Sequence, residues 1–229
     1  MTARLFASPI AGRPWRGRRW LMLAPHPDDE TLGAGALIAQ AGAAGCLAAL
    51  VYLTDGSGSH PSYEGKVGRL VAMREREAKL ALRRLTSARS GAPLFLRWKD
   101  AFPEQAGSPA FERSRRKLVA LCVRLRVDVL VTTAPQEPHC DHAAAAGLAR
   151  AVQTTASRML EIAEYLVWGA PPDGRTHRAL MTMPMRLGLR RHALAAHRSQ
   201  LTASYGTGFR LPKDKRSMTP HDMLYVRRR

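Results

Sequence analysis

Residues 21–35 read LMLAPHPDDETLGAG, and the fold of this chain is organised around them. An apolar run over residues 20–24 ends abruptly in residues 25–30 (PHPDDE), and an alanine-rich stretch follows over residues 31–44. This order predicts a buried strand, a tight turn and a helix that begins at the acidic residues, where its N-terminus favours negative charge. Carboxylates and an imidazole crowded at one corner are costly unless a cation compensates, and this ligand set suits zinc. The alternative is a turn whose carboxylates only cap the helix.

Apolar runs and helical patterns alternate through the rest of the chain. The expected strands lie at residues 19–24, 47–53, 93–98, 127–133 and 164–168, and the expected helices at residues 29–43, 66–85, 111–125, 143–155 and 185–203. Such alternation predicts a parallel, doubly wound α/β sheet. We find no repeat or linker and expect one domain over residues 1–229, with residues 1–18 as an irregular basic lead-in.

A second polar cluster, residues 134–142 (APQEPHCDH), repeats the arrangement of the first at the end of the strand expected at 127–133. The carboxyl ends of parallel strands share one edge of the sheet, so the two corners can meet. Together they offer His26, Asp29 and His142 as three metal ligands, which leaves a fourth position for water as in a catalytic zinc site. Two surface histidines in a turn are the alternative reading of the second cluster alone.

Three further side chains in these corners are candidates for catalysis. Asp28 is placed to take a proton from the water. His139 can stabilise an oxyanion or protonate a leaving amine, and Asp141 can orient His139.

Arg74 lies on the apolar stripe of the helix expected at 66–85. Its guanidinium either reaches out to solvent from the edge of that stripe or points into a pocket and holds substrate hydroxyls or an anion.

Four motifs give the chain a resemblance to a known family. Residues 24–30 (APHPDDE), 74–77 (RERE), 139–142 (HCDH) and 197–200 (HRSQ) resemble, in order, the (A)HPDDE, RxxE, HxDH and HxSQ segments of the LmbE-like, or PIG-L-like, zinc N-deacetylases. Cys140 stands where many members are expected to have proline.

The resemblance implies a Rossmann-like three-layer α/β sandwich with a mostly parallel sheet. It also implies Zn²⁺ held by His26, Asp29 and His142, with Asp28 as general base. The implied reaction removes the N-acetyl group from an aminosugar, typically an N-acetylglucosamine unit, in a small molecule or a glycolipid. Arg74 would contact that sugar or the group attached to it.

Composition adds weaker expectations. The 229 residues carry 36 Lys plus Arg against 18 Asp plus Glu, a formal net charge of +18. Such a charge attracts anionic partners or surfaces, although scattered arginines on a solvated surface explain it equally well. Three cysteines without CxxC spacing favour a reducing cytoplasm. No signal peptide and no apolar run of about 20 residues is found, so we expect no transmembrane segment.

Two other function classes remain open from the residues. A metal-dependent hydrolase could act on another N-acyl group or on a phosphoester, but phosphoester chemistry often uses two metals and only one three-ligand site is apparent. A basic nucleic-acid-binding domain would need a helix-turn-helix or an aromatic stacking platform. Aromatic residues make up only 6% of the chain and are not interleaved with arginine, so we expect no specific nucleic acid partner.

Overall fold

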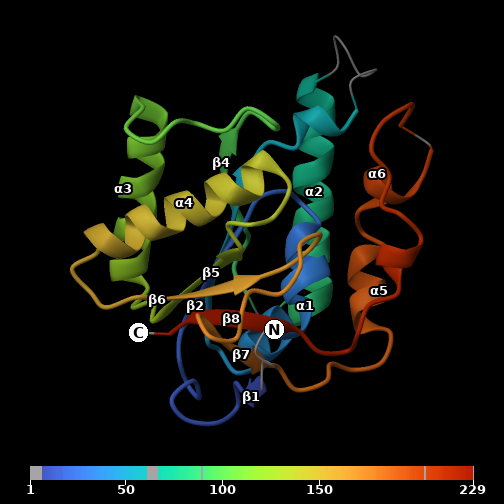
Figure 1. Ribbon diagram of the computed structural model, residues 1–229. Coiled ribbons are helices and arrows are strands. Elements are labelled where there is room, and N and C mark those ends of the chain that lie inside the picture. The colour runs from blue at the N-terminus through green and yellow to red at the C-terminus, as the bar shows by residue number, and fades with distance from the viewer. Residues whose placement is uncertain (1–6, 61–66, 89, 204, 229) are drawn as a thin grey trace.

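The fold is built on one eight-stranded sheet with helices on both faces (Figure 1). The computed structural model describes residues 7–60, 67–88, 90–203 and 205–228. The strands are β1 Ala7–Pro9, β2 Trp20–Ala24, β3 Leu47–Thr54, β4 Leu94–Trp98, β5 Val129–Thr133, β6 Glu161–Tyr165, β7 His177–Met181 and β8 Met223–Arg227. The helices are α1 Asp29–Ala43, α2 Val67–Thr86, α3 Pro109–Arg124, α4 Cys140–Thr155, α5 Leu189–Leu194 and α6 Arg198–Leu201, with short 3₁₀ helices η1 Ser57–Ser59 and η3 Asp214–Arg216.

The order of strands across the sheet is β1-β7-β8-β6-β5-β2-β3-β4. Within the described residues, β8 is the antiparallel strand, and every other pairing is parallel. β2 lies between β3 and β5, with Leu21 opposite Leu130 and Leu23 opposite Thr132. The carboxyl ends of β2 and β5 are therefore neighbours on one edge, as the sequence predicts for its two polar corners.

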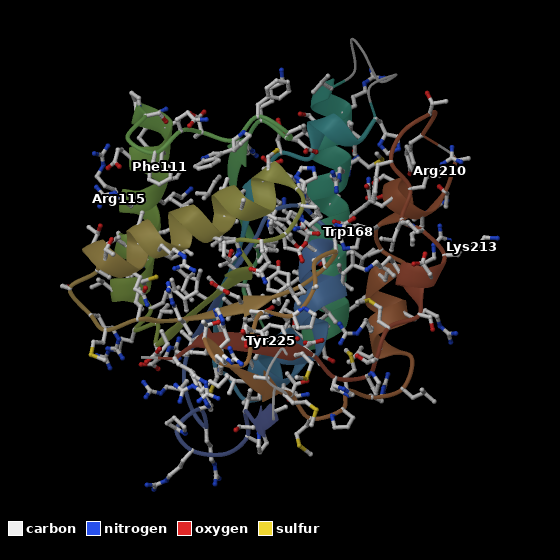
Figure 2. All side chains as sticks on the ribbon, in the orientation of Figure 1. Phe111, Arg115, Trp168, Arg210, Lys213 and Tyr225 are labelled. Atoms are coloured by element: carbon white, nitrogen blue, oxygen red, sulfur yellow. The ribbon has the colours of Figure 1, made fainter. Side chains whose placement is uncertain are left out.

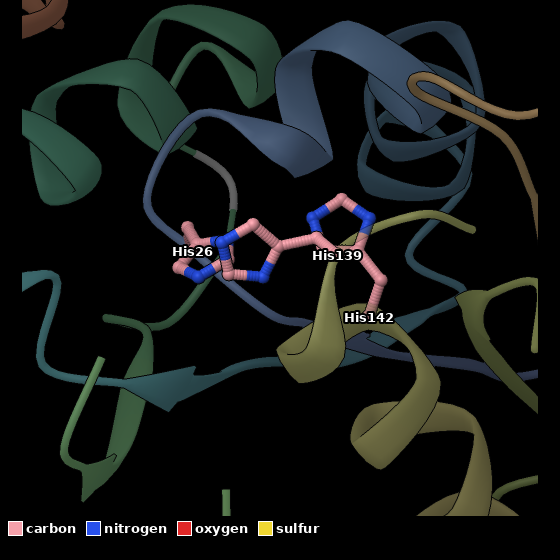
Figure 3. A group of neighbouring side chains, drawn as sticks. All are labelled: His26, His139 and His142. Carbon is pink, nitrogen blue, oxygen red and sulfur yellow. The ribbon is translucent and has the colours of Figure 1, made fainter. Parts of the chain in front are cut away.

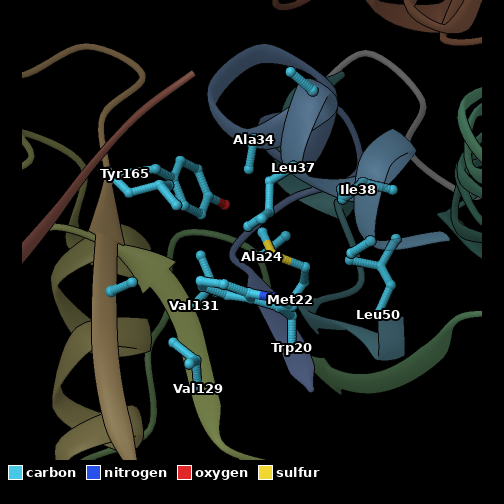
Figure 4. Close-up of a cluster of buried hydrophobic side chains, with 14 of the residues drawn as sticks. Trp20, Met22, Ala24, Ala34, Leu37, Ile38, Leu50, Val129, Val131 and Tyr165 are labelled. Atoms are coloured by element: carbon cyan, nitrogen blue, oxygen red, sulfur yellow. The ribbon is translucent and has the colours of Figure 1, made fainter. Parts of the chain in front are cut away.

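The central strand β2 reads WLMLA and is buried at all five positions because both faces of the sheet are covered. Trp20, Met22 and Ala24 join a core shared with α1, α2 and α5 (Figure 4). Leu21 and Leu23 join a second core with α3 and α4 on the opposite face. The predicted three-layer α/β sandwich with a mostly parallel sheet is confirmed.

Helix α1 approaches the sheet closely at Gly33. A Cβ atom built there would lie 2.1 Å from the ring of Tyr165 on β6, so only glycine fits. The small residues that follow the acidic residues 28–30 thus allow the start of α1 to pack against the strands. This contact fixes the corner that carries Asp28 and Asp29.

Several elements differ from the sequence prediction. The strand expected at 164–168 is Glu161–Tyr165, and the strand His177–Met181 was not expected. The helix expected at 185–203 is two short helices, α5 and α6, because His197 leaves helical geometry at φ −81° and ψ 59° and turns its side chain inward. The lead-in is not wholly irregular, since Ala7–Pro9 adds a parallel edge strand to β7. Residues 61–66 lie outside the described residues, and the segment before them forms η1.

No helix among the described residues has the length and hydropathy that crossing a bilayer would require.

Candidate metal-binding active site

The two polar corners meet at the carboxyl edge of the sheet. His26 follows β2, Asp29 begins α1 and His142 lies in the first turn of α4. Oδ2 of Asp29 lies 3.0 Å from Nδ1 of His26 and 3.2 Å from Nε2 of His142. Bonds of about 2.0–2.2 Å to a tetrahedral zinc ion would separate neighbouring ligand atoms by roughly 3.3–3.5 Å, so the Asp29 oxygen lies near the spacing that zinc needs from each of the two nitrogens.

The imidazoles of His26, His139 and His142 gather at this point (Figure 3). Their ring nitrogens lie within 4.8 Å of one another, and so do the possible ligand atoms of a second group, His26, Asp100, His139 and Asp141. His26 and His139 belong to both groups, and the predicted ligand Asp29 belongs to neither. The two ring nitrogens of His26 face different carboxylates. Nδ1 faces Asp29, whereas Nε2 faces the carboxylates of Asp141 at 3.0 Å and Asp100 at 3.3 Å.

Each histidine proposed as a ligand has a carboxylate on its other nitrogen. His142 Nδ1 lies 3.0 Å from Glu137, and His26 Nε2 lies 3.0 Å from Asp141. Such partners fix the ring orientation and the tautomer of a metal-binding imidazole. The Asp141 carboxylate lies 3.8 Å from Nδ1 of His139, so it contacts His26 more closely than the His139 ring that the sequence suggested.

The paired charges shift the acid–base behaviour of these groups. Burial by itself lowers the pKa of His142, but the carboxylates of Asp29 and Glu137 outweigh it and raise the pKa to about 9. Burial acts in the opposite sense on Asp29, whose pKa is nevertheless lowered by the imidazoles of His142 and His26. The carboxylate at the centre of this set therefore stays ionised, which suits a ligand for a cation.

Asp28 is the carboxylate left over beside this set. It is buried and lines the pocket, and its φ of +135° is rare for a residue with a side chain. Its backbone N–H donates to Glu30 over 2.9 Å. Burial, helped by the charge of Asp29, raises the pKa of Asp28 to about 7, the range in which a carboxyl group can both take and release a proton.

Arg74 does not reach solvent. Its side chain is 3% exposed, and its guanidinium donates to the carbonyls of Gly56 at 2.9 Å and Pro27 at 2.8 Å. It also lies 3.9 Å from Asp28 and 3.7 Å from Asp100. Burial excludes the solvent-facing alternative, and Arg74 lines the pocket, whereas its contact with a substrate stays a prediction. The same side chain joins three loops at the carboxyl edge.

His139 caps the N-terminus of α4, and its Nδ1 accepts the backbone N–H of Asp141 over 3.2 Å. A backbone N–H can only donate, so the neutral ring carries its proton on Nε2. Burial and the neighbouring His26 lower the pKa of His139 and favour that neutral form. The adjacent Cys140 is exposed, and partial burial near Asp141 raises the pKa of its thiol. The thiol belongs to neither metal-competent group.

The two remaining motifs dock against each other. Glu77 of α2 accepts the backbone N–H of Ser199 at 2.9 Å and its hydroxyl at 2.6 Å. This brings His197 to 3.3 Å from Glu30, so the third buried carboxylate of the first corner also has its own partner. The RxxE and HxSQ segments thus support the corner from the side of α2 and α6.

A pocket of about 420 Å³ opens above these residues. Its polar floor includes Asp100, which the sequence prediction missed although an acidic residue two positions after a strand at this edge was a usable signal. Its mouth is formed by Trp168, Phe209 and Pro212. Nothing in the local sequence marks these three, because they come from segments without regular periodicity.

Comparison with known proteins gives one family and several solved structures of similar fold. The model of the PIG-L family, described as GlcNAc-PI de-N-acetylase, matches residues 21–153. A comparison with curated protein sequences finds no match.

Among solved structures, N,N'-diacetylchitobiose deacetylase from Pyrococcus horikoshii is 19% identical, with 91% of this chain and 83% of that chain covered and a TM-score of 0.63. The conserved protein TT1542 from Thermus thermophilus is 27% identical, with 80% of each chain covered and a TM-score of 0.52. The zinc-inhibited form of teicoplanin deacetylase Orf2 is 18% identical, with 92% and 98% covered and a TM-score of 0.59. At 18–19% identity, the two deacetylases show the shared fold alone.

Proposed function

Because this chain belongs to the PIG-L family and is a metal-dependent N-deacetylase, we propose that it removes the acetyl group from an N-acetylglucosamine-type aminosugar conjugate with Zn²⁺ as its metal. One observation carries the proposal. The Asp29 carboxylate lies within 3.2 Å of nitrogens from two imidazoles, and a second buried carboxylate, Asp28, stands beside it at the floor of the pocket.

His26, Asp29 and His142 would hold the zinc ion, and their two nitrogens and one oxygen are a donor set that zinc accepts. When bound, the ion supplies Lewis acidity toward a water molecule and the amide carbonyl. The carboxylates of Asp141 and Glu137 keep the two imidazoles in place through their outer nitrogens. Asp28 does not hold an imidazole in place. Among the hydrogen bonds and ion pairs of the described residues, its side chain has none with a histidine ring.

Asp28 accepts a proton from water as the new carbon–oxygen bond forms at the amide carbon. His139 presents its Nε2–H to the developing negative charge on the carbonyl oxygen, which is stabilised by a donor held in place beforehand. The carbon–nitrogen bond then breaks, and the proton taken by Asp28 passes to the leaving nitrogen. The products are acetate and the free amine.

We propose that Arg74 binds the sugar. It lines the pocket next to Asp28 and Asp100, and its guanidinium is fixed by two backbone carbonyls before any ligand arrives. A donor held in this way can bind sugar hydroxyls without losing side-chain entropy on binding. We propose it as a contact to the hydroxyls of the acetylated ring.

The test is acetate release from free N-acetylglucosamine, its glycosides and N-acylated analogues, measured before and after chelation. Chelation should abolish release and Zn²⁺ should restore it. p-Nitrophenyl phosphate serves as the matched phosphoester. Release of p-nitrophenol together with failure to release acetate from every acetamide would replace the deacetylase proposal with the phosphoester alternative.

A further inference from the structure

The mouth of the pocket differs in chemistry from its floor. The floor is polar and carries Asp28, Asp29 and Asp100 among its residues, whereas the mouth is walled by Trp168, Phe209 and prolines. Phe209 remains 42% exposed, which leaves apolar surface uncovered at the entrance. A reacting acetamido sugar placed on the floor does not account for these walls.

Trp168 is held in place by its backbone. The carboxylate of Glu137 accepts the N–H groups of Val167 at 3.0 Å, Trp168 at 3.1 Å and Gly169 at 2.8 Å. The same carboxylate contacts His142, so the position of the indole is tied directly to a proposed metal ligand. A Cβ atom at Gly169 would lie 2.9 Å from Glu137, so glycine permits this close approach.

The segment over residues 205–216 contacts Trp168 through Lys215. Lys215 donates to the carbonyl of Val167 at 3.0 Å, and its Nζ lies over the indole ring, 5.1 Å from the centroid. Trp168 lies on the same side of the molecule as Arg210 and Lys213 of this segment (Figure 2). The indole therefore has a cation near its ring, and the backbone that carries it is held by hydrogen bonds.

Phe209 is fixed as a second wall. Its backbone N–H donates to Ser59 at 2.7 Å, and Leu211 donates to Gln200 at 2.8 Å while its side chain is buried. The rings of Phe209 and Trp168 stand perpendicular, with their centroids 6.2 Å apart. Two fixed aromatic walls at a right angle form a corner that receives a flat, apolar face at little entropic cost.

From this arrangement we propose that Trp168 and Phe209 form a subsite for the aglycone, and that the preferred substrates are N-acetylhexosaminides whose aglycone is itself a ring, either a second saccharide or an aromatic group. The C–H bonds on one face of a pyranose, like the edge of an aromatic ring, meet the negative face of an indole favourably. The inference rests on the proposed deacetylase function and adds what the enzyme recognises beyond the acetylated ring.

The experiment compares kcat/KM for acetate release from N-acetylglucosamine, N,N'-diacetylchitobiose and phenyl N-acetylglucosaminide. The wild-type protein should prefer the two-ring substrates by about tenfold or more, a preference in keeping with one aromatic contact. Trp168→Ala should reduce that preference about tenfold, mainly through KM, while Trp168→Phe keeps most of it. If Trp168→Ala lowers kcat/KM only for the phenyl glycoside, the preferred aglycone is aromatic. If it lowers kcat/KM only for chitobiose, the preferred aglycone is a saccharide.

Leu187→Ala is the control, since Leu187 is 97% exposed and lies outside the pocket lining, and it should leave every ratio unchanged. Titration with chitobiose should change the tryptophan fluorescence of the wild-type protein more than that of Trp168→Phe. This binding readout does not need turnover.

Three results overturn a claim, and they are distinct. Absence of acetate release from every acetamide removes the proposed function. Turnover with equal kcat/KM for one-ring and two-ring substrates, unaffected by Trp168→Ala, removes the aglycone subsite. If Trp168→Ala lowers kcat/KM for N-hexanoylglucosamine but not for the two-ring substrates, the aromatic corner binds a longer acyl chain. That result would also overturn the inference.

Discussion

Asp28 combines an unusual backbone with an unusual ionisation. Its φ of +135° costs roughly 1–3 kcal/mol for a residue with a side chain. The conformation is held by Glu30, which accepts its N–H, and by Arg74, which binds the preceding carbonyl of Pro27. Strain kept by buried contacts of this kind is typical of active sites, and it supports Asp28 as the group that handles the proton.

Asp28→Asn tests this role. The amide keeps the size of the side chain but cannot take a proton, so kcat should fall by about 10²- to 10⁴-fold. Metal content should stay at the wild-type level because His26, Asp29 and His142 are intact. Metal analysis together with acetate release decides the outcome, and loss of metal in this variant would place Asp28 among the ligands.

Arg74→Lys separates charge from geometry at the pocket wall. Lysine keeps the positive charge near Asp28 and Asp100 but cannot reproduce the two-carbonyl contact of the guanidinium. We expect KM for the sugar to rise about tenfold with metal retained, and the melting temperature to fall. An unchanged KM with a lower melting temperature would make Arg74 a structural residue only.

At the scale of elements, the corner depends on helices that come late in the chain. Ser199 is fully buried, and its hydroxyl and backbone N–H both bind Glu77 of α2. This contact anchors α6 and so presents His197 to Glu30. The predicted single helix over 185–203 would not have allowed it, because a helical backbone at 197–199 would use the same N–H groups internally.

Ser199→Ala should therefore loosen α6. Removing the hydroxyl leaves the Glu77 carboxylate with one of its two partners, at a cost of about 1–3 kcal/mol. Amide hydrogen exchange should speed up around residues 197–201 more than in β2. Thr154→Ala, which removes an exposed hydroxyl on α4, is the control and should leave exchange in α6 unchanged. If amide hydrogen exchange around residues 197–201 is equally fast in Ser199→Ala and Thr154→Ala, Ser199 does not anchor α6.

At the scale of the whole molecule, one carboxylate joins the amino ends of neighbouring strands on the edge opposite the pocket. Asp128 accepts the backbone N–H of Arg19, before β2, at 2.9 Å, and the guanidinium of Arg158, before β6, at 2.6 Å. Burial would raise the pKa of Asp128, but these hydrogen bonds and the nearby arginines lower it overall. Its contribution to stability is thus present above the unfolded pKa of about 3.9 and is lost as the pH falls through the lower folded value.

Asp128→Asn should reduce the free energy of unfolding by about 1–2 kcal/mol at pH 7. Below about pH 4 the difference between the two proteins should shrink, because the wild-type carboxyl group becomes protonated. Urea unfolding of both proteins over a pH series measures this difference directly. A difference that stays constant across the series would mean that Asp128 acts by shape and not by charge.

The layered α/β fold and the meeting of the two polar corners could be predicted from the order of residues alone. Both follow from local pattern: apolar runs buried on two faces must be central strands, and parallel strands place their carboxyl ends on one edge. The sequence also pointed to Asp28, Asp29, His26, His139 and His142 as a cluster because they lie directly at those strand ends.

The partner of each side chain could be assigned only once the three-dimensional arrangement was known. Distances alone assign Asp141 to His26, turn Arg74 inward, join Glu77 to Ser199 and bring Trp168 and Phe209 to the mouth. These contacts link residues far apart in the chain, and no periodicity encodes them. Hydrogen-bond geometry in a packed interior is set by the relative placement of whole elements, which local pattern leaves undetermined.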